Sequence, residues 1–283
     1  MRIANVDGRA VLVLETGFVD IASASNGRFG PSTRDLLGQL EDLGSWFTDE
    51  APALTETIDR ADLEASGRLG PVVDAPSQIF AVGLNYRTHA AEMGLTPPAQ
   101  PMIFAKFASC LAGANASFPV VSPRTDWEAE LVLVVGHGGR DIAVDAALDA
   151  LAGYCVGQDV SDRDLQMSGS PAQFSLGKSH RNFAPVGPWI TTRDEVPAPN
   201  DLEIECRVND VTFQDSNTHD MVFSVPQIVS YVSSVCELRP GDLIFTGSPH
   251  GVGQGQKPPV FLRSGDHVVT TIAGLGTLRN DAE

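Results

Sequence analysis

Two glutamates one residue apart, Glu128 and Glu130, lie in the segment WEAELVLVVG (127–136). Side chains alternate between the two faces of a strand, so both carboxylates point to the same face. The later residues are apolar on both faces, which predicts a strand buried on both sides. Two neighbouring carboxylates would be costly there without a compensating cation, and their hard oxygens suit Mg²⁺ or Mn²⁺. The alternative is a strand that begins at the surface, with both glutamates solvated.

A third metal ligand is expected from the segment that follows the next strand. Asp159 ends the apolar run YCVGQD and opens the turn DVSDRD. Asp162 and Asp164 are rival candidates, and any of the three aspartates could instead cap a helix. The spacing alone leaves these alternatives open.

His89 and Glu92 form a second candidate pair in the segment NYRTHAAEMG. If this segment is a short helix, residues three apart lie side by side. A carboxylate next to an imidazole fixes its tautomer and raises its basicity, as a general base requires. The alternative is a surface pair without a chemical role.

Lys178 stands in the segment FSLGKSH, where it could neutralise a carboxylate or an enolate, or be a solvated loop lysine. The glycine-rich segment GVGQG (251–255) follows a strand, but QKPP comes next and no helix can begin there. A loop that cradles phosphates needs such a helix N-terminus, so dinucleotide binding is excluded.

The elements that position these residues indicate an α+β fold with a mixed sheet, because strands outnumber helices and do not alternate regularly with them. Apolar or alternating runs predict strands over 79–86, 127–136, 154–160 and 201–210. Periodic spacing predicts helices over 32–48, 141–154 and 224–238. A turn-rich stretch at 68–77 predicts a small N-terminal domain, 1–74, followed by a catalytic domain, 75–283.

The net charge limits the classes of partner that the chain is expected to bind. Against 19 Lys and Arg stand 36 Asp and Glu, a formal net charge of −17. Without clustered basic residues, neither nucleic acid nor an anionic membrane is an expected partner. No apolar run is long enough to span a bilayer, and no secretion signal is apparent, so a cytoplasmic protein is expected. The four widely spaced cysteines are expected to be reduced and mostly buried.

Seven blocks of the sequence, in order, resemble the fumarylacetoacetate hydrolase family, of the bacterial type with a small N-terminal domain. The blocks span about 78–280 and read FAVGLNYRTHAAEMG, DWEAELVLVVG, GYCVGQDVSDRDLQ, GKS, QDSNTHDMVFSVPQIVSYVS, PGDLIFTGSPHGVGQGQKPP and GLGTLRN. The resemblance implies a mixed β-sheet roll or barrel-like body, a homodimer and a bound Mg²⁺ or Mn²⁺.

The resemblance also assigns roles to individual residues. It implies that Glu128, Glu130 and Asp159 hold the metal. The catalytic residues would be His89, Glu92 and Lys178, while Gln166 and Thr246 would contact the substrate.

The sequence departs from the family pattern at several positions near the expected pocket rim. His180 and Arg181 stand where the family has a sequence like FDTF, and Ser248 and His250 replace a threonine and an alanine. His219 replaces a small or polar residue. Arg181 is a candidate for binding a substrate carboxylate. These changes leave the exact substrate open.

The resemblance implies a hydrolase that cleaves a carbon–carbon bond in a small acylpyruvate-type 2,4-dioxo acid through a metal-bound enolate, in aromatic or sugar-acid catabolism. An oxaloacetate-type decarboxylase or a 2-hydroxy-dienoate isomerase could use the same site. A non-catalytic, metal-stabilised binding protein is a further alternative, in which His89, Glu92 and Lys178 would be idle.

Overall fold

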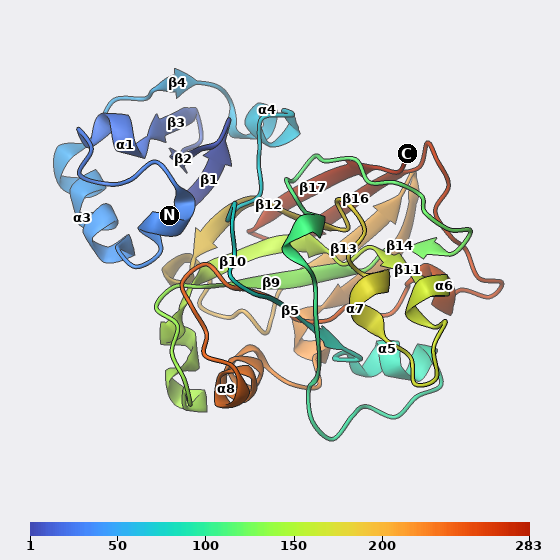
Figure 1. Cartoon of the computed structure of the whole chain (residues 1–283). Coiled ribbons are helices and arrows are strands. Elements are labelled where there is room, and N and C mark those ends of the chain that lie inside the picture. Colours follow the sequence, from blue (N-terminus) through green and yellow to red (C-terminus); the bar gives the residue numbers. More distant parts are fainter.

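The computed structural model describes residues 1–283, and its largest element is a mixed sheet of eleven strands (Figure 1). Ten strands follow the order β4-β3-β2-β1-β12-β10-β9-β15-β5-β6, and β7 pairs with β12 outside this path. Most neighbours are antiparallel; β15–β5 and β12–β7 are parallel. The strands are β1 (Arg2–Val6), β2 (Arg9–Val13), β3 (Gly17–Asp20), β4 (Glu56–Thr57), β5 (Ile79–Gly83), β6 (Met102–Ala105), β7 (Leu111–Ala112), β9 (Ala129–Val135), β10 (Leu151–Gln158), β12 (Ala184–Thr192) and β15 (Leu243–Phe245).

A second sheet of four antiparallel strands contacts the middle of the first, around β9, β10 and β12. Its order is β14 (Val211–Asn217), β13 (Glu203–Val208), β16 (His267–Ile272) and β17 (Gly276–Asp281). The short strands β8 (Thr125–Asp126) and β11 (Ser161–Asp162) form a separate pair. This layered, mostly antiparallel body confirms the α+β class and the mixed-sheet roll expected from the resemblance.

The two central strands, β9 and β10, are buried along their whole length. The apolar run from Leu131 to Val135 is covered on both faces, because the second sheet lies on one side and other core residues lie on the other. In the sequence, strands buried on both faces are continuous apolar runs, without the alternation of apolar and polar residues that half-exposed strands show. A carboxylate at either strand end therefore faces the protein interior.

The helices are short and lie at the edges of the sheets. They are α1 (Ile21–Ala24), α2 (Thr33–Leu36), α3 (Leu40–Glu50), α4 (Arg60–Ala65), α5 (Arg87–Glu92), α6 (Arg163–Gln166), α7 (Phe174–Gly177) and α8 (Val225–Val235). The 3₁₀ turns are η1 (Ala108–Cys110), η2 (Val144–Ala150), η3 (Arg193–Glu195), η4 (Thr218–Asp220) and η5 (Gly253–Gly255). None of the helices is both long enough and apolar enough to span a membrane.

The sequence-based predictions of two helices, over 32–48 and 141–154, are wrong. The helix expected over 32–48 is divided into α2 and α3, with a break at Leu37, Gly38 and Gln39. The helix expected over 141–154 is only the 3₁₀ turn η2, and from Leu151 the chain belongs to β10. The expected helix over 224–238 is α8; Ser224 and Gln227 form its capping box, and Pro226 lies in its first turn.

Residues 1–65 form a smaller unit on one side of the molecule, coloured blue in Figure 1. Its apolar residues, among them Leu36, Leu43 and Trp46, make a small core of their own. The unit is nevertheless joined to the larger body by backbone hydrogen bonds, because β1 pairs with β12. The division at residue 74 remains a prediction.

Candidate metal centre and active site

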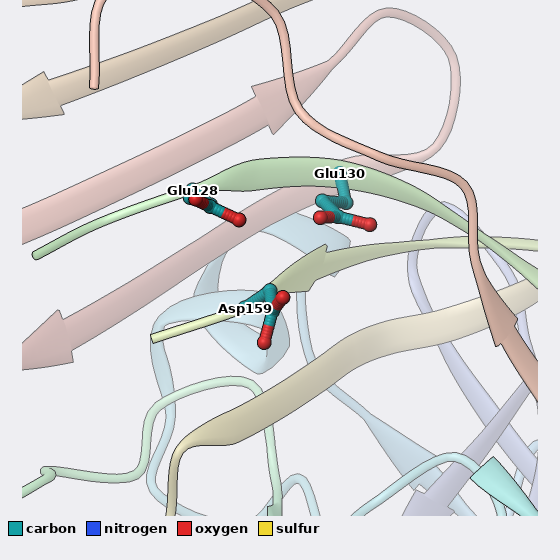
Figure 2. A group of neighbouring side chains, drawn as sticks. All are labelled: Glu128, Glu130 and Asp159. Atoms are coloured by element: carbon teal, nitrogen blue, oxygen red, sulfur yellow. The ribbon is translucent and has the colours of Figure 1, made fainter. Parts of the chain in front are cut away.

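Three carboxylates meet where β9 begins and β10 ends. Glu128 directly precedes β9, Glu130 lies within it, and Asp159 directly follows β10 (Figure 2). The antiparallel register brings them together, because Glu130 is paired with Gly157, and the Asp159 amide donates to the carbonyl of Glu128 over 2.9 Å. One carboxylate oxygen from each residue lies within 4.8 Å of the others. The two glutamates are therefore buried neighbours, and not solvated residues at a strand mouth.

The two rival aspartates lie elsewhere. The Asp162 carboxylate accepts the backbone N–H groups of Asp164 and Leu165 and so caps α6. Asp164 is exposed and pairs with Arg124 at 3.4 Å. Of the three aspartates, only Asp159 belongs to the cluster with the two glutamates.

Two of the three carboxylates are already paired with buried cations. Lys178 Nζ lies 2.6 Å from Glu128 Oε2 and 2.7 Å from Asp159 Oδ2. Lys106 Nζ also donates to Asp159 and to the backbone carbonyl of Lys178. Arg163 reaches Glu128 Oε1 at 2.7 Å. These contacts make the floor of the site a dense ionic cluster with almost no solvent.

Glu130 differs from its neighbours, because it forms no ion pair. Its Oε2 accepts the backbone N–H of Gly247 over 2.7 Å, and its side chain is 1% exposed. Burial, together with the charges of Asp159 and Glu128, raises the pKa of Glu130 well above its usual range. Burial acts in the same direction on Glu128, but Lys178, Arg163 and His89 outweigh it and hold the pKa of that carboxyl well below its usual range.

The donor set fits a hard divalent cation. Asp126, Glu128, Glu130 and Asp159 face three cationic side chains, so with all four carboxylates ionised the cluster would carry one negative charge without a partner. A buried charge of this kind is costly unless it is paired. Three carboxylates with oxygens within reach of one point are the ligands that Mg²⁺ and Mn²⁺ prefer. The residues present therefore suit the metal that the resemblance implies.

The predicted pair on the short helix is formed. His89 and Glu92 lie on α5, with His89 Nδ1 3.2 Å from Glu92 Oε2. The other carboxylate oxygen, Oε1, accepts the backbone N–H of Gly251 over 2.9 Å. Glu92 is thereby fixed between the helix and the glycine-rich segment 251–255.

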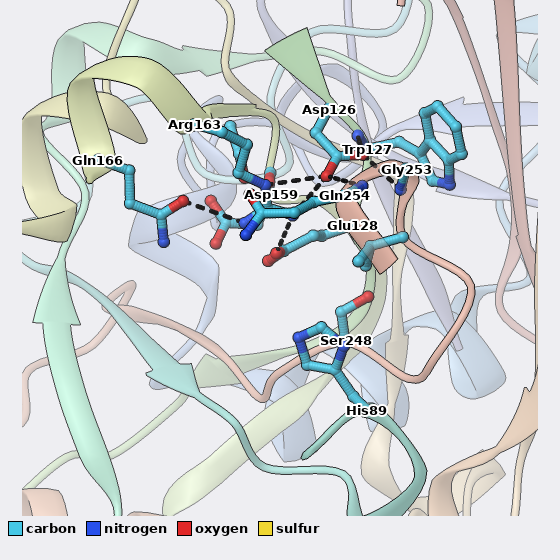
Figure 3. A network of polar contacts seen from close by, with 12 residues as sticks. His89, Asp126, Trp127, Glu128, Asp159, Arg163, Gln166, Ser248, Gly253 and Gln254 are labelled. Carbon is cyan, nitrogen blue, oxygen red and sulfur yellow. Dashed lines mark hydrogen bonds and ion pairs between the residues drawn. The ribbon is translucent and has the colours of Figure 1, made fainter. Parts of the chain in front are cut away.

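That glycine-rich segment also holds a second carboxylate. The backbone N–H groups of Gly253 and Gln254 donate to the two oxygens of Asp126, over 2.7 and 3.0 Å. Asp126 in turn pairs with Arg163 at 2.8 Å, and Arg163 pairs with Glu128 (Figure 3). The segment 251–255 therefore positions carboxylates, and does not cradle phosphates. One loop thus connects the His89–Glu92 pair, through Asp126 and Arg163, with Glu128 of the candidate metal site.

A small cavity of about 40 Å³ opens between this pair and the ionic cluster. Figure 3 shows His89 and Ser248 facing Glu128 and Arg163 across it. Four polar or charged side chains and four apolar ones line it, together with Gly83: His89, Glu128, Lys178, Ser248, Val82, Leu84, Phe104 and Phe174. The imidazole of His89 and the candidate ligand Glu128 thus border the same cavity.

The three residues predicted to contact the substrate, Gln166, Thr246 and Arg181, do not line this cavity. Gln166 is buried and its Oε1 accepts from Arg163 over 3.0 Å, while the Thr246 hydroxyl donates to the carbonyl of Leu131 over 2.9 Å. Neither residue lines the cavity. Arg181 is exposed, forms no ion pair and is also absent from the cavity wall.

The three unusual histidines are also dispersed. His219 is exposed near Asp201, and His180 Nε2 contacts Asp162 at 3.2 Å. His250 precedes the glycine that holds Glu92, and its buried Nδ1 has no partner. None of the three lines the cavity.

Sequence reasoning missed three charged residues of the cluster: Lys106, Asp126 and Arg163. A lysine flanked by the apolar residues of PMIFAKFA was a signal for Lys106, since a charge in such a run is buried only with a partner. Asp126 and Arg163 carried no local signal. Their partners are separated from them by tens of residues in the sequence.

Comparison with known proteins identifies a matching family model and similar solved structures. Residues 78–282, more than half of the chain, match the model of the fumarylacetoacetate (FAA) hydrolase C-terminal domain. A "putative HpcE protein" from Mycobacterium smegmatis is 44% identical, with a TM-score of 0.92 over 100% of this chain and 99% of that one.

Two further solved structures carry named activities. A 2-hydroxyhepta-2,4-diene-1,7-dioate isomerase from Mycobacterium marinum is 31% identical, with a TM-score of 0.74 over 100% of this chain and 98% of that one. A maleylpyruvate hydrolase from Sphingobium sp. SYK-6, solved with manganese(II) and pyruvate, is 29% identical, with a TM-score of 0.80 over 100% and 98%.

Proposed function

The chain belongs to the fumarylacetoacetate hydrolase family, and we propose that it is a metal-dependent hydrolase that cleaves a carbon–carbon bond in a small acylpyruvate-type 2,4-dioxo acid. The observation that carries this proposal is that His89, Lys178 and Glu128 line one cavity, and that Glu128 belongs to the cluster of three carboxylates. The manganese and pyruvate bound by the Sphingobium hydrolase support both the metal and the 2-oxo acid.

We assign Glu128, Glu130 and Asp159 as the ligands of Mg²⁺ or Mn²⁺. When bound there, the dication supplies Lewis-acid stabilisation of negative charge on the oxygens of a 2-oxo acid. Lys178 adds a second positive charge at the same place, because its Nζ contacts two of the three ligands. The buried surroundings strengthen this electrostatic stabilisation relative to water.

His89 acts as the general base in this proposal. Its Nδ1–H donates to Glu92, which leaves Nε2 free to take a proton from a water molecule. The hydroxide adds to the acyl carbonyl carbon, and the bond between that carbon and the neighbouring methylene carbon breaks. The bonding electrons leave as the enolate of pyruvate, which is then protonated at carbon. One carboxylic acid and pyruvate are the products.

Two alternative reactions use the same residues without attack by water. An oxaloacetate-type decarboxylase would release CO₂ and form the same enolate. A 2-hydroxy-dienoate isomerase would move a proton and leave the mass unchanged, and the Mycobacterium marinum neighbour makes this the main alternative. Hydrolysis is preferred because His89 faces the cavity with a carboxylate behind it, an arrangement suited to activating water.

A product screen tests the proposal. The protein, loaded with Mg²⁺ or Mn²⁺, is incubated with acylpyruvates, oxaloacetate and hydroxy-dienoates, and the products are identified by mass. We expect pyruvate plus a second carboxylic acid from the acylpyruvates, with a requirement for the metal. CO₂ release or a product of unchanged mass would favour one of the alternatives. Metal binding without any turnover would favour the non-catalytic role.

The family resemblance also supports a homodimer, a small N-terminal domain over 1–74 and a place in aromatic or sugar-acid catabolism as proposals. Light scattering of the purified chain tests the first: a mass of about twice the 30.0 kDa chain is expected. A monomer at micromolar concentration would contradict it.

A further inference from the structure

The wall of the cavity beside the carboxylate cluster combines polar or charged side chains with apolar ones. Phe104 of β6 and Phe174 of α7 pack edge to face, with ring centroids 5.6 Å apart. Val82 and Leu84 complete the apolar wall. Lys178 Nζ stands 5.5 Å from the centroid of the Phe104 ring, so the aromatic wall begins directly beside the ionic cluster. A substrate whose oxygens lie at the cluster and whose other end enters this cavity would contact these rings.

The cavity wall offers no lysine or arginine that is free to pair with a further carboxylate. Lys178 is the only lysine or arginine on the cavity wall, and it is already held by Glu128 and Asp159. The nearby basic residues are engaged as well: Lys106 binds Asp159, and Arg163 binds Asp126 and Glu128. Arg87, on α5, donates to the backbone carbonyls of Asp220 and Met221.

From this arrangement we infer that the chain selects 2,4-dioxo acids whose acyl group is uncharged and apolar, and that Phe104 and Phe174 are the residues that select it. This inference rests on the proposed function. An acyl group that ends in a second carboxylate would have to bury that charge against two aromatic rings, without a cation. Such burial is costly, and a site can discriminate strongly by leaving a charge unpaired. The neighbours named for maleylpyruvate and a heptadiene-dioate take substrates with that second carboxylate.

The experiment compares two probes of similar length, butanoylpyruvate and maleylpyruvate, with the Mn²⁺-loaded protein. Their dissociation constants are measured by calorimetry on His89→Ala, in which turnover is expected to be slow, and kcat/KM is measured on the wild type. We expect the neutral acid to bind at least tenfold more tightly and to be cleaved with the higher kcat/KM. Equal or tighter binding of maleylpyruvate would overturn the inference.

Two substitutions test whether Phe174 itself selects the acyl group. Phe174→Arg adds a cation to the apolar wall and is expected to shift the binding ratio by at least tenfold toward maleylpyruvate. Phe107→Arg is the matched control, because Phe107 is 51% exposed and does not line the cavity. An unchanged ratio in Phe174→Arg, or an equal shift in both variants, would contradict the role of Phe174. If the wild type cleaves neither acid, the proposed hydrolysis fails, whereas the binding ratio still decides the inference.

Discussion

Gly255 lies directly against the carboxylate of Glu92. A Cβ atom added to Gly255 would stand 2.2 Å from Glu92 Cδ and 2.5 Å from each carboxylate oxygen. No side chain fits there unless Glu92 moves, and Glu92 is the residue that orients the His89 ring. The absence of a side chain at one loop position therefore fixes the geometry of the proposed general base.

The first prediction follows from this contact. Gly255→Ala displaces the end of a flexible side chain and no backbone, so we expect little change in the free energy of unfolding. With Glu92 displaced, kcat should fall at least tenfold, while Mn²⁺ binding is retained. Gly67→Ala is the control, since an added Cβ there meets nothing within 4 Å. A kcat in Gly255→Ala equal to that of the wild type would show that the reaction does not depend on the present position of the Glu92 carboxylate.

A second prediction concerns His89 itself. His89→Ala removes the proposed proton acceptor but none of the assigned metal ligands, so we expect kcat to fall by about 10²–10⁴-fold. Mn²⁺ affinity, measured by calorimetry, should stay within a few-fold of the wild type. A loss of less than tenfold in kcat would remove His89 from the role of base.

A third prediction concerns stability and pH in the N-terminal unit. The hydrogen bond from Arg9 lowers the pKa of Asp20 to about 2, and the backbone N–H of Ser23 adds to the effect. Because this pKa is depressed in the folded protein, the stabilisation is present above pH 4 and disappears as the pH falls toward 2.

Asp20→Asn should therefore lower the free energy of unfolding by about 1 kcal/mol at pH 7, a modest value because Arg9 is half exposed. Urea unfolding at pH 7 and pH 3 measures this difference, which should be smaller at pH 3. The same difference at both values would contradict the assignment.

Much of the site could be predicted because it follows from local rules. The two-residue period places Glu128 and Glu130 on one face, and the helical three-residue spacing brings His89 to Glu92. Asp159 could be proposed because it ends the neighbouring strand. The counter-charges could not be predicted: the pairing of Asp126 with Arg163 depends on how segments distant in the sequence meet in the fold.

The errors in the helices have a physical cause in tertiary packing. Leu36 and Leu37 are buried in different cores, the first in the small N-terminal core and the second in the main one. Between these two contacts and α3, the chain leaves the helical path at Leu37, Gly38 and Gln39. At 151–154, pairing with β9 and β12 overrides the helical spacing of the sequence. Periodicity indicates which residues are buried, but not which core receives them.

The most direct test of the account is calorimetric titration of the metal-free chain with Mn²⁺, compared with Glu130→Gln. Of the three candidate ligands, Glu130 alone has no cationic partner, so we expect one site per chain in the wild type and at least a hundredfold weaker binding in the variant. Glu205→Gln, a change on the second sheet, should bind like the wild type. Equal affinity in Glu130→Gln and the wild type, or no binding by the wild type, would contradict the central claim.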